Sequence, residues 1–147
     1  MSTTTAASPY AAPATTGSAQ DVLALVGRIL IATLFIPAGF AKLMGFAGTA
    51  GYIAAVGLPL PQLAAAIAVA VELGVGILVL IGFKTRLAAF VLGLFTIATA
   101  VFFHNYWAMP LEKVQMNQLN FYKNMAIAGG LFAFAALGAG RFSIDRK

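Results

Sequence analysis

The sequence has no cysteine and few charged residues. Cys is absent from the 147 residues, and 4 acidic residues stand against 9 Lys and Arg. Without thiols this chain alone cannot form disulfides, ligate an iron–sulfur cluster or attach a c-type haem. The single histidine, His104, excludes an internal bis-histidine haem. With no Cys or second His, we predict no metal site.

Catalytic motifs are also missing from the sequence. It contains no phosphate-binding loop, no zinc-ligand spacing and no serine nucleophile motif. The residues therefore leave open whether the protein is an enzyme.

What the chain has in abundance is apolar surface. It is 61% hydrophobic and only 9% charged, whereas soluble domains carry about 25% charged residues. Mean hydropathy is +0.94, so we predict an integral membrane protein whose main partner is the lipid bilayer. A net charge of +5 would suggest nucleic acid in a soluble protein. Here the basic residues flank apolar runs and set orientation in the membrane, so we expect no nucleic-acid partner.

The apolar runs predict an all-α fold, an integral membrane four-helix bundle. Residues 1–21, rich in Ser, Thr, Ala and Pro, are predicted to be a disordered cytoplasmic tail with no secretory signal. Residues 22–147 form the predicted transmembrane domain, in which a short interfacial helix over 46–56 lies between the first and second spans. The four predicted spans cover approximately 22–44, 62–82, 87–107 and 120–139.

Proline and glycine add local expectations. Pro37 should bend the first span, because its ring removes one helical hydrogen bond. Gly129 and Gly130 should allow close helix packing in the fourth span. Residues 108–119 are predicted to form a polar loop before that span.

Glu72 is a carboxylate near the midpoint of the second span. At helical rise it lies about 15 Å from either interface, too far for its side chain to reach water. A charge at the bilayer centre costs about 2.5–3.5 kcal/mol on insertion scales, so such residues usually have partners. Arg28 is the cation nearest in predicted depth, and we expect a buried polar pair between Glu72 and Arg28, direct or through water. A purely structural carboxyl and a proton- or ligand-handling one both remain open.

A second group of polar residues is predicted near the outer ends of the spans. Lys42 and Lys123 could simply be interfacial anchors, and His104 could simply be bonded to water or backbone. If at least two of the group share a crevice, they could bind an anion, a quinone head group or a partner's polar loop. The members of this candidate ligand cluster are Lys42, His104, Lys123 and Asn124.

The order of short motifs resembles the DoxX family of small bacterial membrane proteins, and the resemblance covers Val22 to Asp145. The matching pieces are Gly27-Arg28, Ala38-Gly39-Phe40-Ala41-Lys42-Leu43, Gly57-Leu58-Pro59, Val71-Glu72-Leu73-Gly74, Leu80-Ile81-Gly82-Phe83-Lys84-Thr85-Arg86, Phe121-Tyr122-Lys123-Asn124 and Gly138-Ala139-Gly140-Arg141-Phe142-Ser143-Ile144-Asp145.

The resemblance implies a four-helix protein of the bacterial inner (plasma) membrane. The family takes its name from a subunit associated with an archaeal terminal quinol oxidase. Its relatives include thiosulfate–quinone oxidoreductase subunits and members linked to thiol and oxidative-stress partners. The family has no agreed catalytic motif to carry over to this chain.

Our leading hypothesis is a DoxX-like subunit or accessory of a redox- or quinone-linked membrane complex. Quinone is its expected cofactor, held by no evident motif, and other membrane or redox subunits are its expected partners. The alternative is a non-catalytic assembly protein, or one that handles protons or solutes, with a structural Glu72–Arg28 pair. A quinone-sized cleft near His104 and Lys123 favours the first hypothesis, and a closed, dry bundle favours the second.

The distribution of basic residues predicts that both termini are cytoplasmic, because Lys and Arg concentrate on that face. Reporter fusions at Lys147 and within residues 108–119 should report opposite sides of the membrane. A cytoplasmic report from 108–119 would reverse this orientation. The basic residues on which the predicted orientation rests are Lys84, Arg86, Arg141, Arg146 and Lys147.

Overall fold

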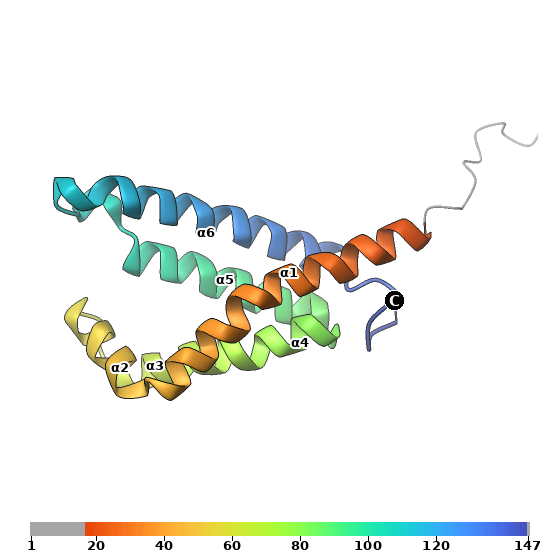
Figure 1. Cartoon of the computed structure of the whole chain (residues 1–147), viewed down its shortest axis with the longest axis horizontal. Helices are drawn as coiled ribbons and strands as arrows, with labels where there is room; N and C mark the ends of the chain where they lie inside the picture. Colours follow the sequence, from red (N-terminus) through yellow and green to blue (C-terminus); the bar gives the residue numbers. More distant parts are fainter. Residues whose placement is uncertain (1–16, 147) are drawn as a thin grey trace, which may run out of the picture.

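Every regular element of the computed structural model, which describes residues 17–146, is a helix, as predicted for an all-α chain. Most of the predicted tail lies outside the described residues. Figure 1 shows an elongated bundle in which α2 lies at the end opposite the C-terminus. The elements are α1 Gly17–Met44, α2 Phe46–Ala55, α3 Pro61–Val69, the π-helix η1 Ala70–Val75, α4 Gly76–Ile81, α5 Thr85–Phe103, the 3₁₀-helix η2 Tyr106–Ala108 and α6 Leu111–Leu137.

Within the described residues, three helical stretches are long and apolar enough to cross a membrane. They correspond to the first three predicted spans, and the second is built from α3, η1 and α4 in succession. α6 contains 27 residues, but its N-terminal part is polar. Its crossing of the membrane, and with it the four-span bundle, remains a prediction, as does the interfacial position of α2. The three stretches are Ala19–Met44, Pro61–Ile81 and Thr85–Ala108.

Two helices begin earlier than predicted. α1 starts at Gly17, so residues 17–21 are helical rather than part of the tail. The Asp21 carboxylate accepts a hydrogen bond from the Arg141 backbone nitrogen at 2.8 Å, which ties this first turn to the far end of the chain. α6 starts at Leu111, inside the predicted loop 108–119, directly after Pro110. The predicted spans rest on hydropathy, which detects only the apolar part of a helix. The prediction therefore omitted the polar first turns of α1 and α6.

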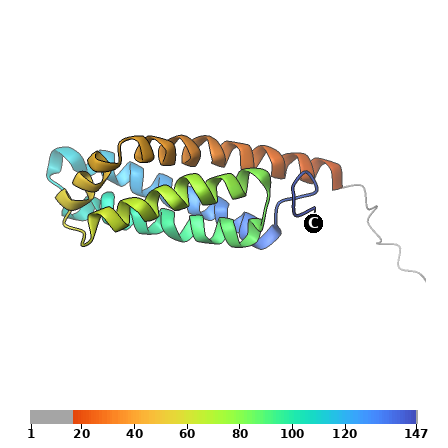
Figure 2. The same ribbon diagram turned by 90° about the horizontal axis from the view of Figure 1, so that it is seen from below.

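The core lies between α1, the second span, α5 and α6, which run along the bundle (Figure 2). A smaller apolar cluster joins Ala50 and Ile53 of α2 to Ala65 of α3, with Phe103 packed beside them. α2 is therefore held against the bundle at the end where α5 finishes. The buried core residues are Phe35, Val79, Ala88, Ala89, Leu92 and Leu131.

The first two spans approach each other closely at Gly39. A Cβ added there would lie 2.5 Å from the Leu73 backbone nitrogen. Gly129 and Gly130 have no such neighbour within 4 Å and are exposed. The prediction that these two glycines mediate close packing is wrong within this chain, because they lie on the outer face of α6.

Pro37 lies inside α1, which continues without interruption to Met44. The ribbon of α1 changes direction along its length in Figure 1, as expected of a helix that lacks one internal hydrogen bond.

The segment after α6 folds over the end of the bundle where α1 begins (Figures 1 and 2). The backbone nitrogens of Ile144 and Asp145 donate to carbonyls at the end of α4, at 3.1 and 2.9 Å. The Asp145 carboxylate accepts hydrogen bonds from the backbone nitrogens of Lys84 and Thr85, each at 2.8 Å. A residue distant in sequence thus caps the N-terminus of α5.

The close approach at Gly39 predicts a sharp stability effect. Gly39→Ala should lower the free energy of unfolding by about 1–3 kcal/mol, because the new methyl group meets backbone that cannot move aside. Thermal unfolding of the purified protein in mild detergent measures this. Gly129→Ala is the matched control, since its methyl group would enter open space. Equal unfolding midpoints for the two variants would contradict the packing described here.

Candidate functional site

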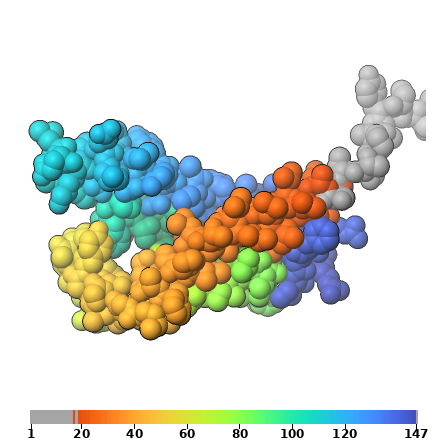
Figure 3. Space-filling view, in the orientation of Figure 1, coloured from red at the N-terminus to blue at the C-terminus, as the bar shows by residue number. Residues whose placement is uncertain are grey.

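A cavity of about 710 Å³ lies between α1, α2, the second span and α5. Most of its wall is aliphatic and aromatic, with Phe35, Ile67 and Phe95 among the lining residues. At the α2 end, Figure 3 shows the surface indented between α2 and the start of α6. The polar and charged side chains on the wall include Lys42, Glu72, Thr96, Thr99, His104 and Asn124.

A salt bridge between Lys42 and Glu72 lies in the wall of this cavity. Lys42 Nζ donates to Glu72 Oε2 at 2.6 Å. Glu72 is only 8% exposed, and a buried carboxylate in a span needs a partner. The Lys42 ammonium on the neighbouring helix compensates its charge. The ammonium of Lys42 has three donors and gives one to Glu72, which leaves it further donors for a ligand.

The predicted direct contact between Glu72 and Arg28 is wrong. Arg28 is fully buried and donates from its NH1 atom to the Leu80 carbonyl at 2.6 Å and from its NH2 atom to the Phe142 carbonyl. Leu80 lies about 12 Å along the span from Glu72 at helical rise. The guanidinium instead binds backbone carbonyls where the C-terminal segment crosses α4.

Glu72 sits in the π-helix η1, a feature that the sequence reading did not predict. π-helical turns are rare and recur at functional sites, where they re-aim side chains. η1 also lies close to α1, since a Cβ on Gly39 would lie 3.0 Å from the Glu72 carbonyl carbon. One location therefore combines the wide turn, the close helix contact and the buried charge.

His104 follows the last turn of α5 and is held by a residue of α6. Its Nδ1 lies 3.2 Å from the Asn117 side-chain oxygen. With that oxygen as acceptor, Nδ1 donates and Nε2 remains available to a ligand. Asn117 was missed because residues 108–119 were expected to form a loop. As a helix, this segment places Asn117 and Asn124 two turns apart on one face.

The structure brings Lys42, His104 and Asn124 to the wall of the same cavity. Lys123 is exposed on α6 and is not among the lining residues. Of the four residues grouped at the sequence level, three therefore share a crevice and one does not. Across residues 17–146, no group of three or more His, Cys, Asp and Glu side chains is placed to hold a metal ion.

Two aromatic rings cover the cavity on the α2 side. Tyr52 of α2 stacks on Phe103 of α5 with ring centroids 5.6 Å apart, and both residues line the cavity. The arrangement offers an apolar chamber with an ammonium, a carboxylate, an imidazole and an amide on its wall. Such a combination suits a largely apolar molecule that carries a few hydrogen-bonding atoms.

Comparison with known proteins places the chain among inner-membrane proteins. The DoxX family model matches residues 23–105. Inner membrane protein YphA of Escherichia coli (strain K12) is 45% identical over 131 residues, covering 89% of this chain and 94% of the relative. Inner membrane protein YqjF of the same organism is 42% identical over 127 residues, covering 86% and 92%. No solved structure matches the chain.

The salt bridge predicts a specific mutant cycle. Glu72→Leu alone should destabilise the protein, because it removes the partner of the Lys42 ammonium. The Lys42 side chain is 34% exposed, so we expect a smaller cost than the roughly 3–5 kcal/mol of breaking a fully buried pair. Adding Lys42→Leu should recover part of that loss, whereas adding Arg28→Leu should not. Unfolding midpoints in detergent give the comparison. A higher unfolding midpoint after adding Arg28→Leu to Glu72→Leu would contradict the observed pairing. An unchanged midpoint after adding Lys42→Leu would also contradict it.

Proposed function

This chain belongs to the DoxX family of inner-membrane proteins, and we propose that its cavity binds a membrane quinone. In this proposal the protein is a subunit or accessory of a redox-linked membrane complex. The observation that carries it is the apolar cavity with Lys42, Glu72, His104 and Asn124 among its lining residues.

The size and composition of the cavity support a quinone. At about 710 Å³ it falls within the usual range of small-molecule sites, roughly 300–1,000 Å³. The ring and isoprenoid chain of a quinone are apolar and match its aliphatic and aromatic wall. Such a molecule would reach the cavity from the bilayer, in which it is dissolved.

Hydrogen bonding supports the same ligand class. A quinone has two carbonyl oxygens, which accept hydrogen bonds and carry no donor. The Lys42 ammonium and the Asn124 amide are donors on the cavity wall. The Lys42–Glu72 bridge holds the ammonium in place, so little freedom would be lost when a carbonyl binds.

The role proposed for the chain is to hold and position the quinone. With no cysteine and a single histidine, the chain has no evident ligand set for an electron carrier of its own. Electrons would therefore travel between the quinone and a partner subunit.

Quinone binding predicts that the full-length protein, purified in mild detergent, contains extractable quinone. It should also bind a short-chain ubiquinone analogue in equilibrium dialysis. The double variant Lys42→Met with Glu72→Gln removes the ammonium without stranding a charge. We expect about 10- to 100-fold weaker binding, the loss of one hydrogen bond from a charged donor. Lys123→Met is the matched control, because Lys123 lies outside the cavity wall.

Two results would contradict the proposal. The first is a wild-type protein that neither contains quinone nor binds the analogue. The second is equal affinity in the double variant and in Lys123→Met, which would locate any binding elsewhere. Either would favour the alternative, a non-catalytic assembly or proton- or solute-handling protein in which the Lys42–Glu72 bridge joins two spans.

A further inference from the structure

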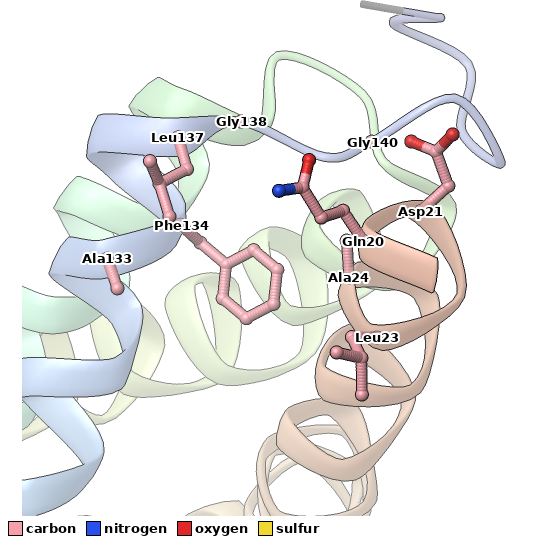
Figure 4. Close-up of a pocket in the computed structure, with 9 residues that line it drawn as sticks. All are labelled: Gln20, Asp21, Leu23, Ala24, Ala133, Phe134, Leu137, Gly138 and Gly140. Atoms are coloured by element: carbon pink, nitrogen blue, oxygen red, sulfur yellow. The ribbon is translucent and has the colours of Figure 1, made fainter. Parts of the chain in front are cut away.

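A second hollow lies at the opposite end of the bundle, between the beginning of α1 and the end of α6. This groove has a volume of about 520 Å³. Figure 4 shows the Phe134 ring reaching from α6 into the space between α6 and α1. A Cβ added at Gly27 would lie 2.8 Å from that ring, so the ring forms the closed inner wall of the groove.

The flanks of the groove are apolar and face outward. Leu23 of α1 is 70% exposed and Leu137 of α6 is 80% exposed, and both line the groove with Ala24 and Ala133. Leu23 and Ala24 belong to the first membrane-spanning stretch. Apolar flanks beside a membrane-spanning stretch match the acyl chain of a lipid from the bilayer.

The far end of the groove is polar, and Asp21 is the charged residue in its lining. The Gln20 amide and the Asp21 carboxylate lie beside Gly138 and Gly140 (Figure 4). Asp21 accepts a hydrogen bond from the Arg141 backbone nitrogen at 2.8 Å, so Arg141 follows the groove directly and its side chain is exposed.

Among the residues that the structure describes, basic side chains outnumber acidic ones at this end. The carboxylates of Asp21 and Asp145 both accept hydrogen bonds from backbone nitrogens. The exposed cations described at this end are Lys84, Arg86, Arg141 and Arg146. Of these, Arg86 donates to the backbone carbonyls of Ala136 and Leu137 at the end of α6. Basic pockets between spans on the cytoplasmic side are typical sites for anionic lipid head groups.

We propose that the groove between α1 and α6 binds an anionic glycerophospholipid. One acyl chain lies along Leu23, Phe134 and Leu137, and the phosphate is placed beside the Arg141 guanidinium. The site is separate from the cavity at the other end of the bundle, and binding there does not depend on a quinone.

Native mass spectrometry of the full-length protein in detergent tests this, with phosphatidylglycerol and phosphatidylcholine of identical acyl chains as probes. We expect phosphatidylglycerol to bind more tightly. Arg141→Gln should remove about fivefold of that preference, the effect of one cation near a lipid surface. Arg146→Gln, at the same end of the bundle, should keep the preference.

A second pair of variants tests the acyl-chain contact. Ala133→Phe fills the groove and should weaken binding of both lipids, whereas Ala126→Phe, two turns away on the exposed face of α6, should not. The two alanine variants should unfold at similar temperatures, which separates loss of lipid from loss of fold.

Four results would overturn the proposal. Equal affinity of the wild type for the two lipids would show general solvation by lipid. Equal behaviour of Ala133→Phe and Ala126→Phe would place the lipid elsewhere. Displacement of the lipid by inorganic phosphate at similar concentration would indicate a simple anion site. Binding that emerges only after deletion of residues 2–16 would show that the chain itself occupies the groove.

Discussion

The Lys42–Glu72 salt bridge meets the strongest constraint on this fold, which is the cost of a carboxylate at the middle of a membrane span. The bridge requires α1 to approach η1, and Gly39 permits that approach because it has no side chain to meet the Leu73 backbone. Paired in this way, Glu72 can remain on a cavity wall that is otherwise mostly apolar. The contact between the first two spans and the candidate ligand site thus depend on the same few atoms.

The two ends of the bundle are stabilised by different kinds of contact. At the end that carries the C-terminus, the buried Arg28 and the capping Asp145 bind backbone groups. These two residues fix the C-terminal segment, and neither of them lines a candidate ligand site. At the other end, the polar groups are side chains around a cavity covered by α2. A ligand can replace contacts between side chains on a cavity wall more readily than contacts to the backbone. This difference is consistent with a quinone site at the α2 end of the bundle.

The all-helical class, the first three spans and the family could be predicted from the sequence, because hydropathy and motif order are local properties. The partner of Glu72 could not. Counting residues along ideal α-helices gives Arg28 and Glu72 similar depths in the membrane, and this count predicts that the two side chains meet. In the structure Arg28 is bound by the C-terminal segment and Lys42 reaches inward, which depends on tertiary contacts. The π-helix has no sequence period of its own, and the polar first turns of α6, which carry Asn117, have no hydrophobic signal.

The ionised state of Glu72 can be measured directly by infrared difference spectroscopy between the wild-type protein and Glu72→Gln in detergent at neutral pH. The chain has only 4 acidic residues, so the carboxyl region of the spectrum is simple. A salt bridge to Lys42 predicts that the substitution removes an ionised carboxylate band. Loss of a protonated carboxyl band from the wild-type protein would contradict the ion pair on which this account depends.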